Sequence, residues 1–350
     1  TSLADRFPAL ENVVYQKGLG SIADKSRRVM QLAARIAEET GTNAAAASRA
    51  AELGKCDLVT GMVGEFPGLQ GTMGRYYAMA SGEDAEVATA IEQQYQPRFA
   101  GDDLPSSAEG RAVSLAERLD TLAGAFALGK KPTGNRDPFG LRRSALGIVR
   151  ICVESRLDLA IDELVDRAIE LQPVASSDTA EVHAFVLERL RSYALDRLGV
   201  NSDMFAAVRA RNPATLVDFA DRLLAVRDFV ALEAAAALAA ANKRIGNILR
   251  QADLDTSGVV DEALLSDRAE AALHAAVSEA QSAVTPLIER RAYGEALARL
   301  AELRPSVDAF FDDVMVMADE PAVRLNRLRL LSSLREQFLQ VADVSRLAIK

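Results

Sequence analysis

The side chains that could carry out catalysis are few in this chain and far apart. The two histidines, His183 and His274, lie within apolar helical patterns, and the two cysteines, Cys56 and Cys152, lie in distant segments. The sequence has no GxxxxGK[ST] phosphate loop, no GxSxG turn and no HExxH helix. Because nucleophiles, bases and metal ligands must stand within contact of one another, we expect neither a catalytic nor a metal site.

Cations that could contact phosphate groups occur in two clusters. The first surrounds a loop rich in proline and glycine and consists of Lys130, Lys131, Arg136, Arg142 and Arg143. The second consists of Lys243, Arg244 and Arg250, with Asn247 between them. The net charge of −9 argues against a protein that binds nucleic acid mainly through nonspecific phosphate contacts. The clusters are therefore either local RNA-binding surfaces or solvated faces, and both interpretations stay open at this point.

The elements that would position these clusters are helices. Apolar residues return at spacings of three and four, as in Val29, Leu32 and Ile36, and do not alternate. Breaks rich in Gly, Pro, Asn and Asp separate the helices, and Pro321 is placed to begin the last one. The sequence predicts an all-α fold in three regions: a helical domain over 1–150, a middle helical region over 151–227 and a helical bundle over 228–350.

The composition is typical of a globular protein in a reducing compartment. Apolar residues make up 49% of the 350 residues, and two cysteines are too few for a disulfide framework. The longest apolar run, Ala234 to Ala241, is short of the about 20 residues that cross a bilayer. We expect a cytoplasmic protein without a membrane partner. Because the chain starts at Thr1 without Met, we also expect a piece of a longer protein.

Three segments carry a resemblance to a known family. They are KCDLVTGMVGEFPGLQGTMGRYYA (Lys55 to Ala78), KPTGNRDPFGLRRSALGIVRI (Lys131 to Ile151) and FFDDVMVMADEPAVRLNRLRLL (Phe310 to Leu331). With these segments the chain resembles the C-terminal half of the β subunit of the bacterial tetrameric glycyl-tRNA synthetase. The resemblance runs over nearly the whole chain. It implies a part in tRNA binding and assembly within the enzyme that attaches glycine to tRNA.

The first domain resembles the HD-type helical domain found in that family. HD phosphohydrolases hold a divalent metal with several histidines and aspartates, and Cys56–Asp57 stands here where the His–Asp pair would be. Both histidines lie outside this domain. The resemblance therefore implies a degenerate HD-like domain without a metal site, in which Asp57 caps a helix or pairs with Lys55 or Arg75.

The last region resembles the DALR anticodon-binding domain. The name-giving motif appears as Glu320-Pro321-Ala322-Val323-Arg324, in which the acidic position and the leucine depart conservatively. Further similar segments are Ala241 to Leu249 and Val307 to Val316. The resemblance implies that this bundle meets the anticodon. From the cation cluster and the projection of the last helix, the candidate RNA-binding residues are Lys243, Arg244, Asn247 and Arg329.

The arginines of the last helix are expected to divide between structure and RNA contact. At 100° per residue, Arg324, Arg327 and Arg335 project toward the apolar side, whereas Asn326 and Arg329 project to the opposite side. A guanidinium on an apolar side needs a partner that offsets its desolvation. We therefore expect Arg324 and Arg327 to be structural, with the partner of Arg324 supplied by Asp308, Asp312 or Asp313.

The resemblance also implies partners and cofactors. ATP, Mg and glycine are expected at the α subunit, so this chain alone is expected to lack catalytic activity and to bind no cofactor. The expected partners are tRNA-Gly, the α subunit and a second β subunit in an α2β2 tetramer, and the loop from Lys130 to Arg143 is expected to contact tRNA or the α subunit. Two alternatives stay open: a degenerate HD-domain hydrolase, and a helical scaffold that binds only protein.

Overall fold

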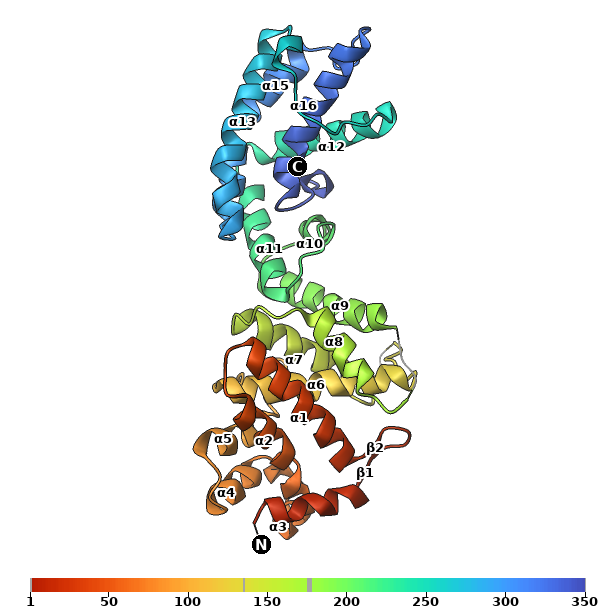
Figure 1. Cartoon of the computed structure of the whole chain (residues 1–350), viewed down its shortest axis with the longest axis vertical. Coiled ribbons are helices and arrows are strands. Elements are labelled where there is room, and N and C mark those ends of the chain that lie inside the picture. The colour runs from red at the N-terminus through yellow and green to blue at the C-terminus, as the bar shows by residue number, and fades with distance from the viewer. Residues whose placement is uncertain (1, 135, 175–177, 350) are drawn as a thin grey trace. The chain divides into compact units, whose positions relative to one another are not determined.

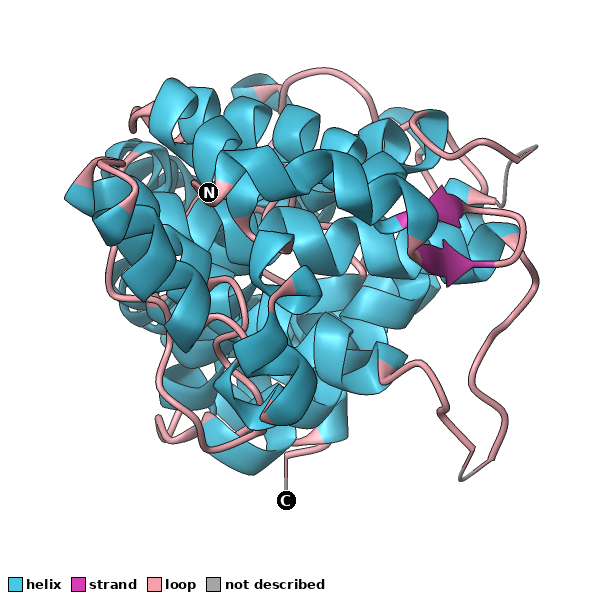
Figure 2. Ribbon diagram, turned by 90° about the horizontal axis from the view of Figure 1, so that it is seen from below, coloured by secondary structure: helices cyan, strands magenta, loops and turns pink. Residues whose placement is uncertain are grey.

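The computed structural model describes residues 2–134, 136–174 and 178–349, and these residues are almost entirely helical (Figures 1 and 2). The prediction of an all-α fold is confirmed. Within the described residues, no helix is both long and apolar enough to span a membrane. The chain divides into two compact units: unit 1 comprises Thr1–Tyr193 and Thr215–Val217, and unit 2 comprises Ala194–Ala214 and Asp218–Lys350. The domain limits near 150 and 227 stay predictions.

Unit 1 is built around three helices, α1, α2 and α6, that pack on one another. Its elements are η1 (Ala4–Asn12), β1 (Val14–Gln16), β2 (Gly20–Ser21), α1 (Ile22–Glu39), α2 (Ala44–Leu53), η2 (Cys56–Val59), α3 (Gly61–Glu65), η3 (Pro67–Leu69), α4 (Thr72–Ala80), α5 (Ala85–Gln93), α6 (Ala108–Ala127), α7 (Leu141–Glu154), α8 (Ile161–Glu170) and α9 (Thr179–Arg197), whose last turn passes into unit 2. The two short strands pair as an antiparallel hairpin, which Figure 2 shows in magenta at one edge.

The helices of unit 1 begin at side chains suited to capping. Ser21 and Asp24 form a capping box at α1, and Asn43 and Ser107 accept backbone N–H groups at the starts of α2 and α6. Leu115 and Leu122 of α6 are fully buried. This places α6 in the core, where its polar side chains must find partners inside the protein.

Unit 2 is a second helical bundle, in which α12, α13, α15 and α16 pack on one another. Its elements are α10 (Ser202–Arg209), α11 (Leu216–Val230), α12 (Ala235–Ala252), η4 (Glu262–Leu264), α13 (Arg268–Glu289), α14 (Tyr293–Ala301), α15 (Arg304–Asp313), α16 (Pro321–Leu339) and η5 (Val344–Arg346). As predicted, Pro321 opens the last helix, where a missing backbone N–H has no cost. Phe229 and Phe338 meet edge to face in the core, with their ring centroids 6.2 Å apart.

Candidate functional site

Asp57 lies at the N-terminal end of α4. Its buried Oδ2 accepts hydrogen bonds from the N–H groups of Gly71 (2.6 Å) and Gly74 (3.0 Å). The first N–H groups of a helix have no partner within the helix, so a carboxylate at this point satisfies them and interacts well with the helix dipole. Burial raises the pKa of Asp57 above its ordinary value. In this structure Asp57 therefore serves as a helix cap.

Two glycines of the Gly-rich segment allow this arrangement. Gly71 has a φ of +83°, and a Cβ added there would lie 2.7 Å from the ring of Tyr95. A Cβ added at Gly74 would lie 2.7 Å from Ile91. Both positions need glycine because α4 approaches α5 and Asp57 too closely for a side chain.

We expect Asp57→Ala to destabilise unit 1 by about 1–2 kcal/mol, because two buried N–H groups lose their acceptor. Asp57→Asn keeps an oxygen acceptor and should cost less than about 1 kcal/mol. Urea unfolding of the two variants beside the wild type measures the difference. An Asn variant as unstable as the Ala variant would contradict the capping role.

Charged side chains, most of them buried, meet where α1 packs on α6, and we call them the α1–α6 charge cluster. Its members are Lys25, Arg28, Lys55, Glu117 and Asp120. Asp120 is fully buried, and its oxygens lie 2.9 Å from the Lys25 ammonium and 2.6 Å from Arg28 Nε. The Glu117 carboxylate lies 3.3 Å from Lys25 and 3.5 Å from Lys55. Burial opposes the charged forms, but the neighbouring charges raise the pKa of Lys25 and lower the pKa of Asp120.

The cluster bears on metal binding. Lysine ammonium groups already contact both carboxylates, so the charge that a divalent cation would supply comes from the protein itself. His183 lies on α9 in unit 1 and His274 on α13 in unit 2. Among the residues that the structure describes, no group of three or more His, Cys, Asp or Glu side chains could hold a metal ion.

The loop from Lys130 to Arg143 joins α6 to α7, and most of its cations have contacts within the protein. Lys130 lies over the ring of Phe139 at 5.2 Å, and Lys131 pairs with Glu181. Arg142 donates to the carbonyl of Gly134 at 2.6 Å. Arg136 and Arg143 are exposed, and Arg143 makes one long contact, 3.5 Å, with the carbonyl of Arg98. Of the expected RNA-binding residues here, Arg136 and Arg143 are the most available to a ligand.

The second cluster lies on the exposed side of α12. Lys243, Asn247 and Arg250 are spaced by four and three residues and are all exposed, so they share one face of the helix. Arg244 is exposed too and lies over the ring of Phe311 at 4.3 Å. Arg329 of α16 is half-buried and packs against Gly258. The structure thus brings Lys243, Arg244 and Asn247 together on one surface, while Arg329 is partly enclosed by the loop after α12.

The arginines of α16 differ from the expected pairing. Arg324 is half-buried, and the contact that the structure gives it is a hydrogen bond of 3.4 Å to the carbonyl of Ala318. Asp308 pairs with Arg304 one turn earlier on α15, at 3.4 Å. The expected pairing of Arg324 with Asp308, Asp312 or Asp313 is therefore wrong. The reason is that α15 turns these acidic residues outward, where they are exposed.

Arg327 connects α16 to the start of α13 within unit 2. It is buried, pairs with the fully buried Glu270, and donates to Asp267 at 2.9 Å and to the carbonyl of Met315 at 2.6 Å. Asp267 and Glu270 also form the capping box of α13. Arg327 is thus structural, with partners at the start of α13 that sequence spacing does not reveal.

The C-terminal helices define the class of protein. Residues 238–344 match the family model of the DALR anticodon binding domain, so unit 2 contains an anticodon-binding fold. The chain belongs to the glycyl-tRNA synthetase beta subunit family, whose model matches residues 1–210.

Curated relatives agree with this assignment. The chain is 48% identical over 347 residues to the glycine–tRNA ligase beta subunit of Shewanella amazonensis, covering 98% of this chain and 50% of the relative. It is 49% identical to the beta subunits of Chromohalobacter salexigens and Hahella chejuensis, over 99% and 100% of this chain and 51% of each relative. The chain thus spans about half the length of the curated relatives it matches.

Proposed function

We propose that this chain is the tRNA-binding and assembly part of a glycine–tRNA ligase β subunit, which supports the ATP-dependent attachment of glycine to tRNA-Gly by the α–β enzyme. The observation that carries this proposal is the exposed cationic face of α12, which lies inside the region matched by the anticodon-binding domain. In a protein of net charge −9, cations gathered on one helix face provide a local surface for RNA phosphates.

The catalytic parts are proposed to lie elsewhere in the enzyme. ATP, Mg and glycine would bind the α subunit, and unit 1 would contribute a degenerate HD-like domain in which Asp57 caps α4 and the α1–α6 charge cluster replaces a metal. The three-part division at about 150 and 227 and a cytoplasmic location belong to the same proposal.

The partners are proposed to be tRNA-Gly, the α subunit and a second β subunit in an α2β2 tetramer. Exposed apolar side chains on the α3–α4 segment support a protein partner for unit 1, because such groups are seldom left together in water. They are Met62 (42% exposed), Phe66 (58%), Tyr76 (54%) and Met79 (57%).

The α12 surface gives a direct test. Lys243 and Arg250 have no ion-pair partner among the described residues, so Lys243→Ala with Arg250→Ala should leave the fold unchanged. The affinity of the assembled enzyme for tRNA-Gly should fall about tenfold at low salt and less at high salt. A matched control, Arg268→Ala with Arg290→Ala, removes the same charge from the first residue of α13 and from the residue that follows its end. Equal affinity of both double variants would contradict the proposed surface.

A further inference from the structure

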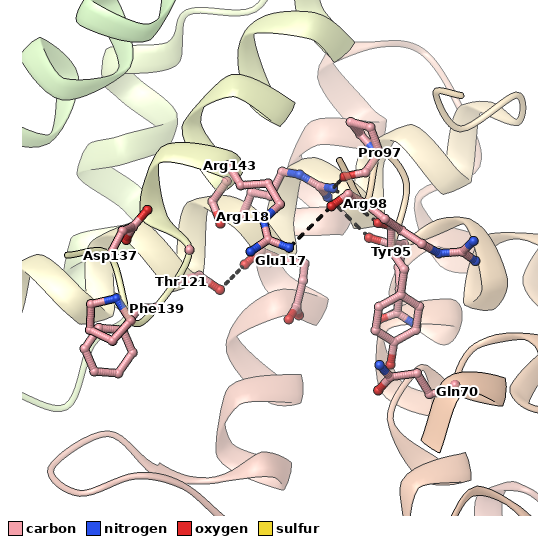
Figure 3. Close-up of a pocket in the computed structure, with 15 residues that line it drawn as sticks. Gln70, Tyr95, Pro97, Arg98, Glu117, Arg118, Thr121, Asp137, Phe139 and Arg143 are labelled. Carbon is pink, nitrogen blue, oxygen red and sulfur yellow. Dashed lines mark hydrogen bonds between the residues drawn. The ribbon is translucent and has the colours of Figure 1, made fainter. Parts of the chain in front are cut away.

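A pocket of about 570 Å³ opens in unit 1, where the loop before α7 meets the segment after α5 (Figure 3). The pocket is lined by Tyr95, Arg98, Arg118, Phe139 and Arg143, together with the acidic residues Glu117 and Asp137. Three arginines in one pocket of an acidic protein call for an explanation.

Arg118 gives the pocket a positive wall. It is buried and donates to the backbone carbonyls of Ser114 at 2.9 Å and Pro97 at 2.8 Å, and among the described residues it has no carboxylate partner. A Cβ at Gly147 would lie 2.2 Å from Arg118 Nε, so glycine makes room for the guanidinium. Burial lowers the pKa of Arg118 to about 10, which keeps it charged at neutral pH.

The two acidic residues of the lining do not neutralise the arginines. Glu117 is engaged by Lys25 and Lys55 of the α1–α6 charge cluster. Asp137 accepts the N–H groups of Leu141 (2.8 Å) and Arg142 (3.0 Å) at the start of α7. The lining thus carries three arginines against two carboxylates, and this excess of positive charge favours an anionic ligand.

The arrangement of the arginines and aromatic rings indicates what kind of anion fits. In the view of Figure 3, Phe139 lies on one side of the pocket, Arg143 near its middle and Arg98 on the opposite side, where Arg98 extends away from Arg143. Phe139 is 38% exposed, and the guanidinium of Arg98 has no partner among the described residues. The Tyr95 ring lies under the Lys55 ammonium at 4.1 Å and its hydroxyl is buried, so Tyr95 forms part of the wall. An exposed aromatic ring beside two separated cations suits a single nucleic-acid strand, whose bases stack and whose phosphates repeat.

From this geometry we infer that the pocket binds a short single-stranded stretch of RNA, with Arg143 and Arg98 on successive phosphates and a base on Phe139. This inference rests on the proposed function, because tRNA is the RNA that the enzyme would hold. It adds a second contact in unit 1, separate from the α12 surface. Arg118 is a positioning residue, since it binds the carbonyls that hold the segment carrying Arg98.

The first test removes the two exposed arginines in the assembled α–β enzyme. Arg98→Ala with Arg143→Ala should weaken tRNA-Gly binding about tenfold at low salt. The slope of log affinity against log salt should fall by about 1.4, the value for two single-strand phosphates. Arg35→Ala with Arg167→Ala is the control, because it removes two exposed, ion-paired arginines from α1 and α8 of the same unit. An unchanged affinity or an unchanged slope for the pocket variant would overturn the inference.

A second variant tests the pocket with little risk to the fold. Phe139→Ala removes a ring that is 38% exposed, so the melting temperature should change little. Binding of tRNA-Gly should weaken at least about fivefold if a base stacks on this ring. Full affinity of this variant would contradict the inference. Competition by AMP that disappears in the arginine double variant would show a pocket for a free nucleotide and would overturn the RNA assignment.

The outcomes also separate this inference from the proposed function. If the wild-type enzyme binds tRNA-Gly and only the α12 variant loses affinity, the pocket is not an RNA site and the proposed function stands. If the wild-type enzyme binds no tRNA-Gly through this subunit, the proposed function fails first.

Discussion

Asp120→Ala is expected to lower the free energy of unfolding of unit 1 by roughly 3–5 kcal/mol, because it leaves Arg28 buried without its carboxylate and Lys25 with Glu117 alone. The Asp120 oxygens also accept a hydrogen bond from Gln172 at 3.0 Å, which would be lost as well. Urea unfolding measures the change, and Asp166→Ala, an exposed acidic residue on α8, is the matched control. A loss below about 1 kcal/mol for Asp120→Ala would show that the cluster does not stabilise the fold.

This stabilisation is expected to depend on pH. Burial alone would raise the pKa of Asp120, but Lys25 and Arg28 hold it below the ordinary value of 3.8. A carboxyl group whose pKa is lowered by folding stabilises the protein fully at pH values above its ordinary pKa. This stabilisation is lost as the pH falls through the lowered pKa of the folded state. As the pH falls from about 5 to about 3, the wild type should therefore lose stability more steeply than Asp120→Ala. Parallel curves would contradict the role of Asp120.

Among the arginines of α16, Arg327 should be the most damaging to replace, and Arg327→Ala is expected to lower the stability of unit 2 by roughly 3–5 kcal/mol. Glu270, which is fully buried, would lose its cationic partner. Arg324→Ala is the control on the same helix and should cost less than about 1 kcal/mol, since Arg324 is half-buried and, among the described residues, bonds only to the carbonyl of Ala318.

Thermal and urea unfolding of the two variants distinguish these roles. If Arg324→Ala were as unstable as Arg327→Ala, the result would support the expectation that Arg324 holds α16 in place. If neither variant lost stability, the capping box of α13 would not need Arg327.

The helical content was predictable because apolar spacing of three and four is a local signal. The start of α16 at Pro321 follows from the same kind of local rule, since proline suits the first helical position. The hairpin of β1 and β2 could not be predicted in this way, because strands of three and two residues are too short to show alternation.

The α1–α6 charge cluster could not be predicted from the sequence, because Lys25, Glu117 and Asp120 have the types of a solvated helix face. Only the packing of α1 on α6 brings them together inside the protein.

The helical projection of α16 was misleading because it too leaves out the packing of neighbouring elements. Asn326, expected on the side away from the apolar stripe, is buried and exchanges two hydrogen bonds with the backbone of Asp261. A single projection assumes one buried face, but α16 packs on several sides.

The expected RNA-binding residues divide in a way that only the structure shows. Lys243 and Asn247 are exposed on one face of α12, whereas Lys131 and Arg142 are engaged by Glu181 and Gly134. Sequence shows where cations are clustered but not which of them already have partners. The pocket residue Tyr95 gives no local signal of its own.

The most direct measurement of the central claim is binding of tRNA-Gly and of a noncognate tRNA to the α–β enzyme at two salt concentrations. We predict that tRNA-Gly binds at least about tenfold more tightly at both salt concentrations, and that affinity falls with salt as phosphate contacts require. We also predict that the Lys243→Ala, Arg250→Ala double variant loses affinity for both tRNAs. Equal affinity of the wild-type enzyme for the two tRNAs, or an affinity independent of both salt and this double substitution, would contradict the proposed function.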